Sequence, residues 1–207
     1  MKLVGQFSLF CYRSWLRLSS KCFSLLVAGA FARFGKRTTL ALPVRIAGEG
    51  RIALGSCVFI GAGSWLQALP DEGNPSVAVS IGDGVSVAGA CVISAVRSVV
   101  LEDDVLLARN VYISDHSHRF TSTDKPVLAQ GLDKIRPVLI RKGAWLGQNV
   151  VVCPGVTIGI GAVIGANSVV TEDVSDFSIA VGAPARVVRS IERDSIPAHE
   201  SELCISR

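Results

Sequence analysis

The sequence of 207 residues is poor in aromatic and charged residues, which make up only 6% and 18% of the chain. Its hydrophobic fraction of 49% excludes a wholly disordered protein, and its length favours one domain or at most two small ones. A core that contains few aromatic side chains, but many Val, Ile, Ala and Gly residues, indicates thin repetitive layers rather than a helical bundle.

Paired cysteines are also missing from the sequence. The six cysteines are scattered, none forms a C-x-x-C pair, and no spacing is typical of a zinc site. Cys57, Cys91 and Cys153 fall inside six-residue repeats, where a free cysteine acts as a small apolar residue. The sequence therefore predicts a reducing location, the cytoplasm, and no required metal.

Acidic residues are absent from the first 48 residues, whereas eight basic residues lie there: Lys2, Arg13, Arg17, Lys21, Arg33, Lys36, Arg37 and Arg45. Residues 49–207 carry the other 13 basic residues and all 17 acidic ones, a balance of 13 − 17 = −4. Many Phe, Leu, Val and Trp residues are interleaved with the basic residues of the N-terminal segment. The chain is therefore electrostatically divided into two parts.

Three interpretations of this basic segment stay open. Its longest uncharged run, Cys22 to Ala32, has 11 residues, which is shorter than the roughly 20 that a transmembrane helix needs. The segment could be an amphipathic helix that binds an anionic membrane surface. It could equally be a helix that packs on the rest of the chain with its basic face in water. A cleaved signal peptide is the third interpretation, although its n-region would be unusually long.

An apolar residue recurs at every sixth position in the second half of the chain: Leu146, Val152, Ile158, Ile164 and Val170. A small residue follows most of them. The same register fits Leu54-Gly55, Ile60-Gly61, Ile81-Gly82, Val87-Ala88 and Leu107-Ala108. A six-residue period matches neither the helical period of about 3.6 nor the simple alternation of a strand.

Each six-residue unit can supply one short strand and one tight corner, so that three units close a triangular coil of 18 residues. Stacked coils about 4.8 Å apart place like residues above one another along each flat face. One coil cannot bury its own interior, so many must stack. The alternative is a β-sandwich with chance spacing, and five consecutive units in register argue against it. The predicted fold class is all-β, a parallel β-helix.

Two interruptions break the repeat before it ends after Val174. Residues 67–79 have the Pro, Gly, Asn and Asp composition of a loop. Residues 114–137 form a longer interruption that contains Asp115, His116 and His118. A long loop that leaves a rigid stack is a usual place for function.

The sequence resembles the hexapeptide-repeat acyltransferases in three motifs that occur in the expected order: the I-G-x-x-x-x units, the Asp-His-Ser-His stretch at 115–118, and the Val-Gly-Ala-Pro-Ala-Arg stretch at 181–186. It is most similar to the sugar and polysaccharide O-acetyltransferases related to the galactoside, maltose and O-antigen enzymes, over residues 44–192. The resemblance implies a left-handed β-helix, a homotrimer, and acetyl-CoA bound between neighbouring subunits. It further implies acetyl transfer to a sugar hydroxyl in the synthesis of a surface polysaccharide or glycolipid.

His116 is the first candidate for the catalytic residue, because it stands where the resemblance places the family's catalytic histidine. An imidazole titrates near neutral pH, which suits a base that takes the proton of an attacking hydroxyl. His118 is the competing base, or a residue that contacts the acceptor. Asp115 could orient a histidine, contact the acceptor sugar, or cap a turn. No nucleophilic serine or cysteine is indicated, and the resemblance implies direct transfer in a ternary complex.

The resemblance also implies residues that bind acetyl-CoA in the late coils: Trp145, Gln148, Ala166, Thr171, Arg186 and Arg189. Trp145 would pack by the pantetheine arm, or else lie outward at a subunit contact. The arginines would bind phosphates. Glu172 stands where close relatives often have Lys, which shifts the phosphate contact toward Arg189. Ala88 stands where the galactoside enzymes have an acceptor-binding Asn, which argues against a galactoside acceptor.

Three other functions are alternatives to sugar O-acetylation. They are acyl transfer to an amine, a metal-dependent lyase of similar fold, and a β-helix without catalytic activity. The lyase needs three histidine ligands across a subunit interface, whereas His116 and His118 are too close in sequence and His199 lies outside the coils.

The expected organisation has three parts: a basic helical segment at 1–43, a β-helix at 44–175 with its loop at 114–137, and a C-terminal segment at 176–207. A short helix or tail is expected from Val187. The expected partners are two further copies of the chain and a sugar or polysaccharide acceptor. Residues 1–43 would add a peripheral contact with the inner face of the membrane, and no nucleic acid partner is expected.

Overall fold

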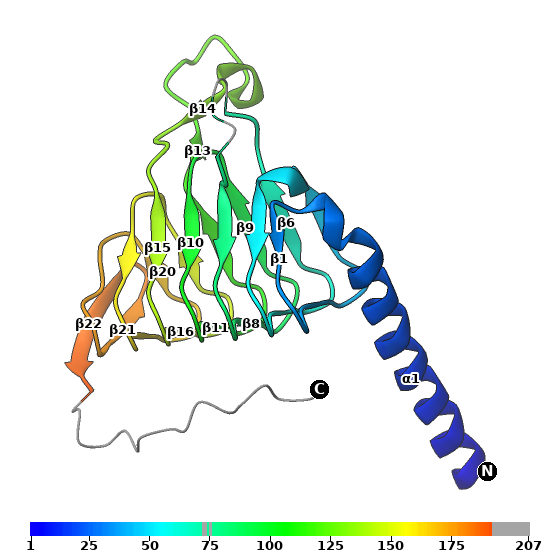
Figure 1. Cartoon of the computed structure of the whole chain (residues 1–207). Helices are drawn as coiled ribbons and strands as arrows, with labels where there is room; N and C mark the ends of the chain where they lie inside the picture. The colour runs from blue at the N-terminus through cyan, green and yellow to red at the C-terminus, as the bar shows by residue number, and fades with distance from the viewer. Residues whose placement is uncertain (72–73, 75, 192–207) are drawn as a thin grey trace.

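The computed structural model describes residues 1–71, 74 and 76–191, and it shows a triangular stack of coils with a long helix at its N-terminal end (Figure 1). The strands form three sheets, which we name A, B and C, and each coil passes through A, B and C in turn. Strands of successive coils are parallel in every sheet, apart from the last strand of sheet B. The predicted parallel β-helix is confirmed.

Sheet A contains β1 (Arg33–Phe34), β4 (Ile52–Leu54), β7 (Val79–Ile81), β10 (Val99–Leu101), β15 (Val138–Ile140) and β18 (Thr157–Ile158). Sheet B contains β2 (Thr39–Leu40), β5 (Phe59–Ile60), β8 (Ser86–Val87), β11 (Leu106–Leu107), β16 (Trp145–Leu146), β19 (Val163–Ile164), β21 (Ser178–Gly182) and β22 (Ala185–Ser190). Sheet C contains β3 (Arg45–Ala47), β6 (Trp65–Ala68), β9 (Val92–Ala95), β12 (Tyr112–Ser114), β17 (Val151–Val152) and β20 (Val169–Val170). A separate hairpin joins β13 (Ser117–His118) to β14 (Leu132–Asp133), and 3₁₀ turns cover Ala28–Ala30, Glu49–Arg51 and Val127–Gln130.

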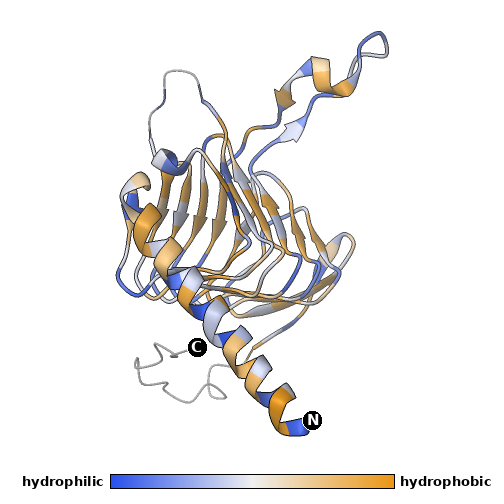
Figure 2. Cartoon of the chain, turned by 90° about the vertical axis from the view of Figure 1, so that its right-hand side faces the viewer, coloured by the Kyte–Doolittle hydropathy of each residue, from blue (hydrophilic) through white to orange (hydrophobic). Residues whose placement is uncertain are grey.

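The residues of the six-residue repeat form the core of the stack. Leu146 lies above Ile164 in sheet B and Val152 above Val170 in sheet C, as direct partners in the parallel ladders, and all four are buried. Figure 2 shows the strands of the stack largely in hydrophobic colours, one coil behind another. Burial of one such aliphatic side chain stabilises the fold by about 1.5–3 kcal/mol, so the ladders supply much of the driving force.

The predicted coil length of 18 residues holds only for the late coils. Trp145 pairs with Val163, a step of 163 − 145 = 18, whereas Thr39 pairs with Phe59, a step of 59 − 39 = 20. The two additional residues lie between sheets C and A, at what we name the C/A corner. Both long loops also leave the stack at this corner. The additional residues and the two loops therefore lie along one edge of the triangular stack.

Asparagines with a left-handed backbone fix the corner between sheets B and C, which we name the B/C corner. Asn110, Asn149 and Asn167 have φ values of 61°, 60° and 60°, a conformation that Asn tolerates better than most residues. The side-chain amide of Asn110 donates to Oδ1 of Asn149 at 3.1 Å, and that of Asn149 donates to Oδ1 of Asn167 at 2.8 Å. This ladder holds successive turns of the corner directly above one another.

Helix α1 (Lys2–Val27) caps the first coil with its C-terminal part only. Ser24 Oγ accepts a hydrogen bond from the backbone N–H of Leu40 at 2.8 Å, and Ser20 Oγ accepts one from that of Leu42 at 3.1 Å. Both serines are buried. The packed-helix interpretation is therefore right for this part, whereas every side chain of residues 2–18, which we name the arm, is exposed.

The boundary expected at residue 43 is wrong, because the first coil already begins at β1 and residues 33–43 are not helical. Phe31 packs into the core just before this strand, at the point where the chain turns from helix to coil. Within the described part of the chain, no helix is long and apolar enough to cross a bilayer.

The helix or tail expected from Val187 is wrong as far as Ser190. β22 turns back beside β21, and Val187 pairs with Ala180 and Arg189 with Ile179 in an antiparallel ladder. The hydrogen-bonding edge that the last coil exposes explains this hairpin, because a returning strand satisfies those groups. His199 and Cys204 lie outside the described residues.

Replacing Ser24 by Ala should lower the free energy of unfolding by about 1–3 kcal/mol, because the buried N–H of Leu40 loses its acceptor. Thermal denaturation followed by circular dichroism measures this loss. Ser14→Ala, on the exposed arm, is the matched control and should leave the midpoint unchanged. Equal midpoints for the two variants would contradict the capping role of α1.

Candidate active site

The C/A corner carries the side chains that are suited to catalysis. Figure 1 shows the hairpin of β13 and β14 rising from this edge of the stack. The long loop begins where β12 ends at Ser114 and returns to the stack at β15. Asp115 and His116 are its first two residues, so they lie at its rigid base rather than at its tip.

Asp115 is the anchor of this corner. Its side chain is 0% exposed and accepts hydrogen bonds from the backbone N–H groups of Val96 at 2.9 Å, Arg97 at 2.7 Å and Ser98 at 2.8 Å. Burial alone would raise the pKa of the carboxyl group, but the hydrogen bonds from His116 and the three amides outweigh it and lower the pKa below its ordinary value of 3.8. Asp115 is therefore an ionised group held inside the protein.

His116 is oriented by that carboxylate. Its Nδ1 lies 2.8 Å from Oδ1 of Asp115 and its side chain is 9% exposed. An ionised carboxylate only accepts hydrogen bonds, so Nδ1 carries the hydrogen and Nε2 keeps its lone pair. Ser114 Oγ adds a second contact, 3.2 Å from Nδ1, and donates to the backbone oxygen of His116. The arrangement leaves Nε2 as the ring nitrogen that can accept a proton.

The placements of Asp115 and His118 separate the roles that the sequence left open for them. Asp115 has both carboxylate oxygens occupied by hydrogen bonds, which favours the orienting and turn-capping roles over a contact with the acceptor. His118 is exposed on β13, where its backbone pairs with Leu132. It lies outside the Asp115–His116 pair, in a position from which it can contact a bound molecule.

Sequence reasoning missed a polar column beside His116. Gln67, Ser94 and Ser114 are direct partners in sheet C, on three successive strands. Ser94 Oγ donates to Oε1 of Gln67 at 3.2 Å, which leaves the amide nitrogen of Gln67 as a further donor near the corner. Their spacings of 27 and 20 residues hide the alignment, because the loop and the longer coil fall between them.

Arg51 holds the loops of this corner together. Its guanidinium group donates to the backbone oxygens of Ser76 at 2.9 Å and Val96 at 3.0 Å, and also to that of Leu69. Arg97 forms an ion pair with Asp71 at 3.8 Å. These contacts fix the segment that supplies three amide groups to Asp115, so the orientation of His116 depends on several coils.

The residues expected to bind acetyl-CoA lie mostly elsewhere. Gln148 and Ala166 are exposed on adjacent turns of the B/C corner, where the N–H of Asn167 donates to the backbone oxygen of Gln148 at 2.8 Å. Trp145 is 48% exposed on the outer face of sheet B, in the strand that leads to this corner. These three residues form one outward surface, which we name the donor corner.

Thr171, Arg186 and Arg189 lie at the C-terminal end of the stack. Thr171 is exposed just after β20, and Arg186 and Arg189 belong to β22. Arg186 forms an ion pair of 3.5 Å with Glu172, and both side chains are more than half exposed. Glu172 therefore partly neutralises the charge of Arg186.

Within one chain the structure does not bring His116 and the donor corner together. They lie at opposite ends of the strands of sheet C, and the six residues from Gln148 to Cys153 span about 15 Å at the rise of a strand. Among the described residues no group of three or more His, Cys, Asp or Glu side chains could hold a metal ion.

Residues 137–172 match the family model of the bacterial transferase hexapeptide with six repeats. A relative from Escherichia coli (strain K12), WbbJ, is named as a lipopolysaccharide biosynthesis O-acetyl transferase; it is 30% identical over 162 residues, which cover 75% of this chain and 80% of that protein. A relative from Mycobacterium tuberculosis (strain ATCC 25618 / H37Rv), named as an acetyltransferase, is 36% identical over 74% of this chain and 49% of its own length. The chain thus spans about half of the mycobacterial relative.

Two solved structures are similar in fold. The galactoside acetyltransferase in complex with coenzyme A has a TM-score of 0.58 and 28% identity, over 85% of this chain and 74% of that one. A variant of AntD, an N-acyltransferase from Bacillus cereus in complex with dTDP and coenzyme A, has a TM-score of 0.70 and 21% identity, over 82% of this chain and 89% of that one.

Asp115→Asn should destabilise the protein at neutral pH by about 2–5 kcal/mol, because the amide group must turn a donor toward an N–H group or the imidazole.

The lowered pKa of Asp115 means that the unfolded chain binds a proton more readily than the folded one. The stability from Asp115 is therefore present above the ordinary value of 3.8 and is lost as the pH falls below it. Urea unfolding at several pH values measures both effects. If the free energy of unfolding falls equally steeply with decreasing pH in the variant and in the wild type, the buried, ionised carboxylate is contradicted.

Proposed function

Because this chain belongs to the hexapeptide-repeat transferase family, we propose that it transfers an acetyl group from acetyl-CoA to a hydroxyl group of a sugar acceptor. Family membership follows from the 30% identity with the Escherichia coli relative over 80% of that protein's length. The family and the acyltransferase class that the motifs predicted are confirmed, and the left-handed β-helix is the fold of the similar solved structures.

The observation that carries the proposal is the His116–Asp115 pair at the base of the loop. A histidine with one ring nitrogen fixed at 2.8 Å from a buried carboxylate is arranged as a general base, because the carboxylate sets the tautomer and stabilises the imidazolium ion that forms. The hydroxyl group of a sugar needs such a base, since it is a weak nucleophile while it keeps its proton.

The reaction that we propose proceeds in a ternary complex. Nε2 of His116 takes the proton of the acceptor hydroxyl as that oxygen bonds to the thioester carbonyl carbon. The C–S bond then breaks, and the imidazolium ion returns its proton to the sulfur that leaves. The products are an acetyl ester and a free thiol, so that atoms and charge balance. Asp115 stays ionised throughout and acts only through His116.

The donor that we propose is acetyl-CoA, bound along the donor corner. Trp145 offers an aromatic face to the pantetheine arm, and Gln148 and Ala166 lie along the path. Arg189 and Arg186 supply positive charge for phosphates near Thr171. The contribution of Arg186 is the weaker one, because its charge is partly neutralised by the ion pair with Glu172. The galactoside acetyltransferase structure, which is 28% identical and holds coenzyme A, supports this donor.

A homotrimer is the assembly that we propose. His116 and the donor corner lie at opposite ends of sheet C in one chain, and a threefold arrangement can place the His116 of one copy near the donor corner of the next. The scattered cysteines, none of them in a C-x-x-C pair, fit a reducing location, and we propose the cytoplasm.

An oxygen acceptor is preferred to an amine because the Escherichia coli relative is named as an O-acetyl transferase. The likeness to the N-acyltransferase, at 21% identity, concerns the fold alone. Incubation with acetyl-CoA and a panel of free, nucleotide-linked and lipid-linked sugars, followed by mass spectrometry, distinguishes the two. Acetyl esters are cleaved by mild base, whereas amides are not.

His116→Ala should lower turnover by about 10²–10⁴-fold and leave the affinity for acetyl-CoA nearly unchanged, because a general base acts in the transition state. Steady-state release of free thiol measures the turnover. His118→Ala is the matched control and should keep turnover within about tenfold of the wild type. If instead His118→Ala abolishes turnover and His116→Ala does not, the assignment of the base is wrong.

A further inference from the structure

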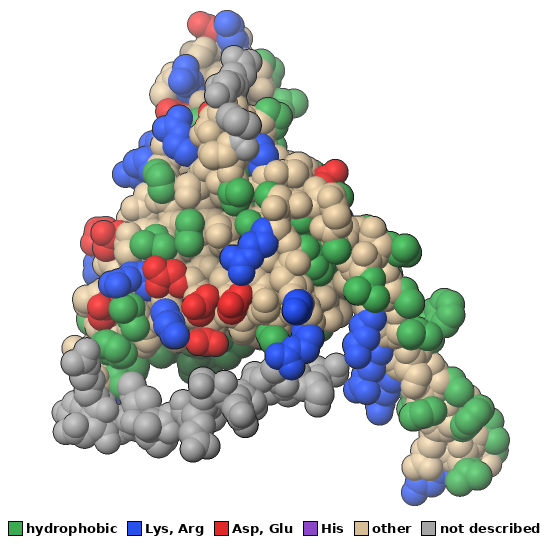
Figure 3. All heavy atoms as spheres, in the orientation of Figure 1, with side chains coloured by type: hydrophobic (Ala, Val, Ile, Leu, Met, Phe, Trp, Pro, Cys, Tyr) green, Lys and Arg blue, Asp and Glu red, His purple; other side chains and the backbone are tan. Residues whose placement is uncertain are grey.

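The arm of α1 is a large apolar surface that no other described residue covers. Phe7 and Trp15 are 68% exposed, Phe10 is 67% exposed and Leu18 is 60% exposed. Figure 3 shows hydrophobic side chains along the helix beyond the body of the protein, with basic side chains beside them. Exposed apolar surface of this extent indicates an interaction site.

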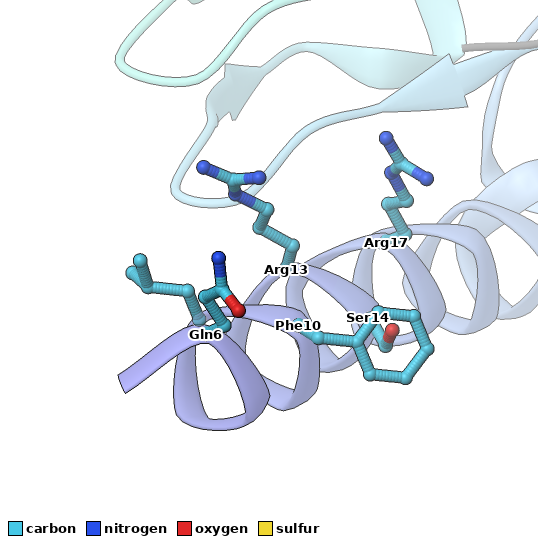
Figure 4. A pocket seen from close by; sticks show the side chains of 6 residues that line it. Gln6, Phe10, Arg13, Ser14 and Arg17 are labelled. Carbon is cyan, nitrogen blue, oxygen red and sulfur yellow. The ribbon is translucent and has the colours of Figure 1, made fainter. Parts of the chain in front are cut away.

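Five apolar side chains of the arm share one face, whereas Leu9 and Leu16 lie on the other side of the helix. Val4, Phe7, Cys11, Trp15 and Leu18 follow one another at steps of three and four residues, which places them in a single stripe on a helix. Arg13 and Arg17 lie on the other side, because they stand two helical turns before Ser20 and Ser24, which face the first coil. Figure 4 shows both arginines rising from the same side of the helix. The stripe therefore points away from the β-helix.

The charge of the arm indicates an anionic partner. Lys2, Arg13 and Arg17 lie on it, Lys21 follows directly, and the first acidic residue of the chain is Glu49. Each basic side chain near an anionic bilayer contributes roughly 1 kcal/mol, a contribution that salt weakens. An apolar stripe with a basic opposite face is the pattern of a helix that lies in the plane of a membrane surface.

A second copy of the arm fits this surface less well. A coiled coil through Val4, Cys11, Leu18 and Leu25 would have a polar residue among its alternate core positions in either register, which are Ser14 and Lys21 in one and Ser8 in the other. Two arms would also repel each other, since neither carries an acidic side chain to pair with the basic ones.

We propose that residues 2–18 dock the enzyme on an anionic lipid surface, with the stripe in the acyl boundary and the arginines at the level of the headgroup phosphates. Ser20 and Ser24 cap the first coil, whereas Cys22 and Leu25 are exposed and continue the stripe on the other side of the helix. The structure thus narrows the membrane contact expected for residues 1–43 to the arm and the exposed face of α1 that continues it. This inference does not depend on the acetyl transfer reaction.

Co-sedimentation of the full chain with vesicles of phosphatidylglycerol and phosphatidylcholine tests the proposal. The wild type should bind these vesicles, and high salt should release it only in part. Replacing Phe7, Trp15 and Leu18 together by Ser should weaken binding more than about tenfold, because the stripe is lost. Leu9→Ser with Leu16→Ser, off the stripe, is the control and should weaken binding less than threefold. Arg13→Gln with Arg17→Gln should weaken binding to the anionic vesicles by roughly tenfold or more and reduce its salt dependence, since Lys2 and Lys21 remain.

Three results would overturn the proposal. The full chain could stay in the supernatant with these vesicles, or the stripe and control variants could lose binding alike. Analytical ultracentrifugation could show instead that the protein associates through the stripe into assemblies larger than a trimer and does not bind vesicles. The stripe would then contact another copy of the chain rather than lipid. Far-ultraviolet circular dichroism of each variant, together with an unchanged melting midpoint, confirms that the fold is intact.

Discussion

The structure depends on one constraint: a coil of this chain cannot bury its own interior, so each must lie in register on the next. Parallel ladders meet the constraint by placing Leu146 above Ile164 and Val152 above Val170. The corners must be equally regular, because a Cβ atom at Gly147 would come within 2.7 Å of the backbone nitrogen of Ala166. The asparagines of the B/C corner serve the same purpose, since their left-handed backbone and amide ladder repeat from coil to coil. Small residues and a uniform period are therefore conditions for stacking.

Both long loops leave the regular stack at one edge, the C/A corner, and the candidate catalytic group lies there. Asp115 joins structure to chemistry, since the same carboxylate that accepts the amides of Val96, Arg97 and Ser98 also fixes the ring of His116. The base thereby gains the rigidity of the coils, although it belongs to the residues that begin a loop. The donor corner is placed by the ladder of Asn149 and Asn167 on the opposite edge of sheet C. Within one chain, His116 and the donor corner therefore lie on opposite edges of sheet C.

The sequence was sufficient for the features that repeat. The period through Leu146, Val152 and Ile158 predicted the core and the parallel coils, and the motif at 115–118 led to the pair that the structure brings within 2.8 Å. Features set by long-range contacts were missed. The first coil begins at Arg33 because Phe31 and the serines of α1 close that end, and no periodic signal marks it. Gln67 and Ser94 come together through a loop and a longer coil, and β22 follows from the edge left by β21.

We propose that one active site takes His116 from one copy of the chain and the donor corner from another. Co-expression of His116→Ala with Ala166→Trp, in which a bulky ring obstructs the donor corner, tests it most directly. Each variant alone should be nearly inactive, whereas each mixed trimer should recover about one of its three sites, which is about a quarter of all sites when the two variants assemble at random. Acetyl transfer by the purified mixture, with mixed assembly verified by two affinity tags, is the measurement. No recovery in verified mixed trimers would contradict the account.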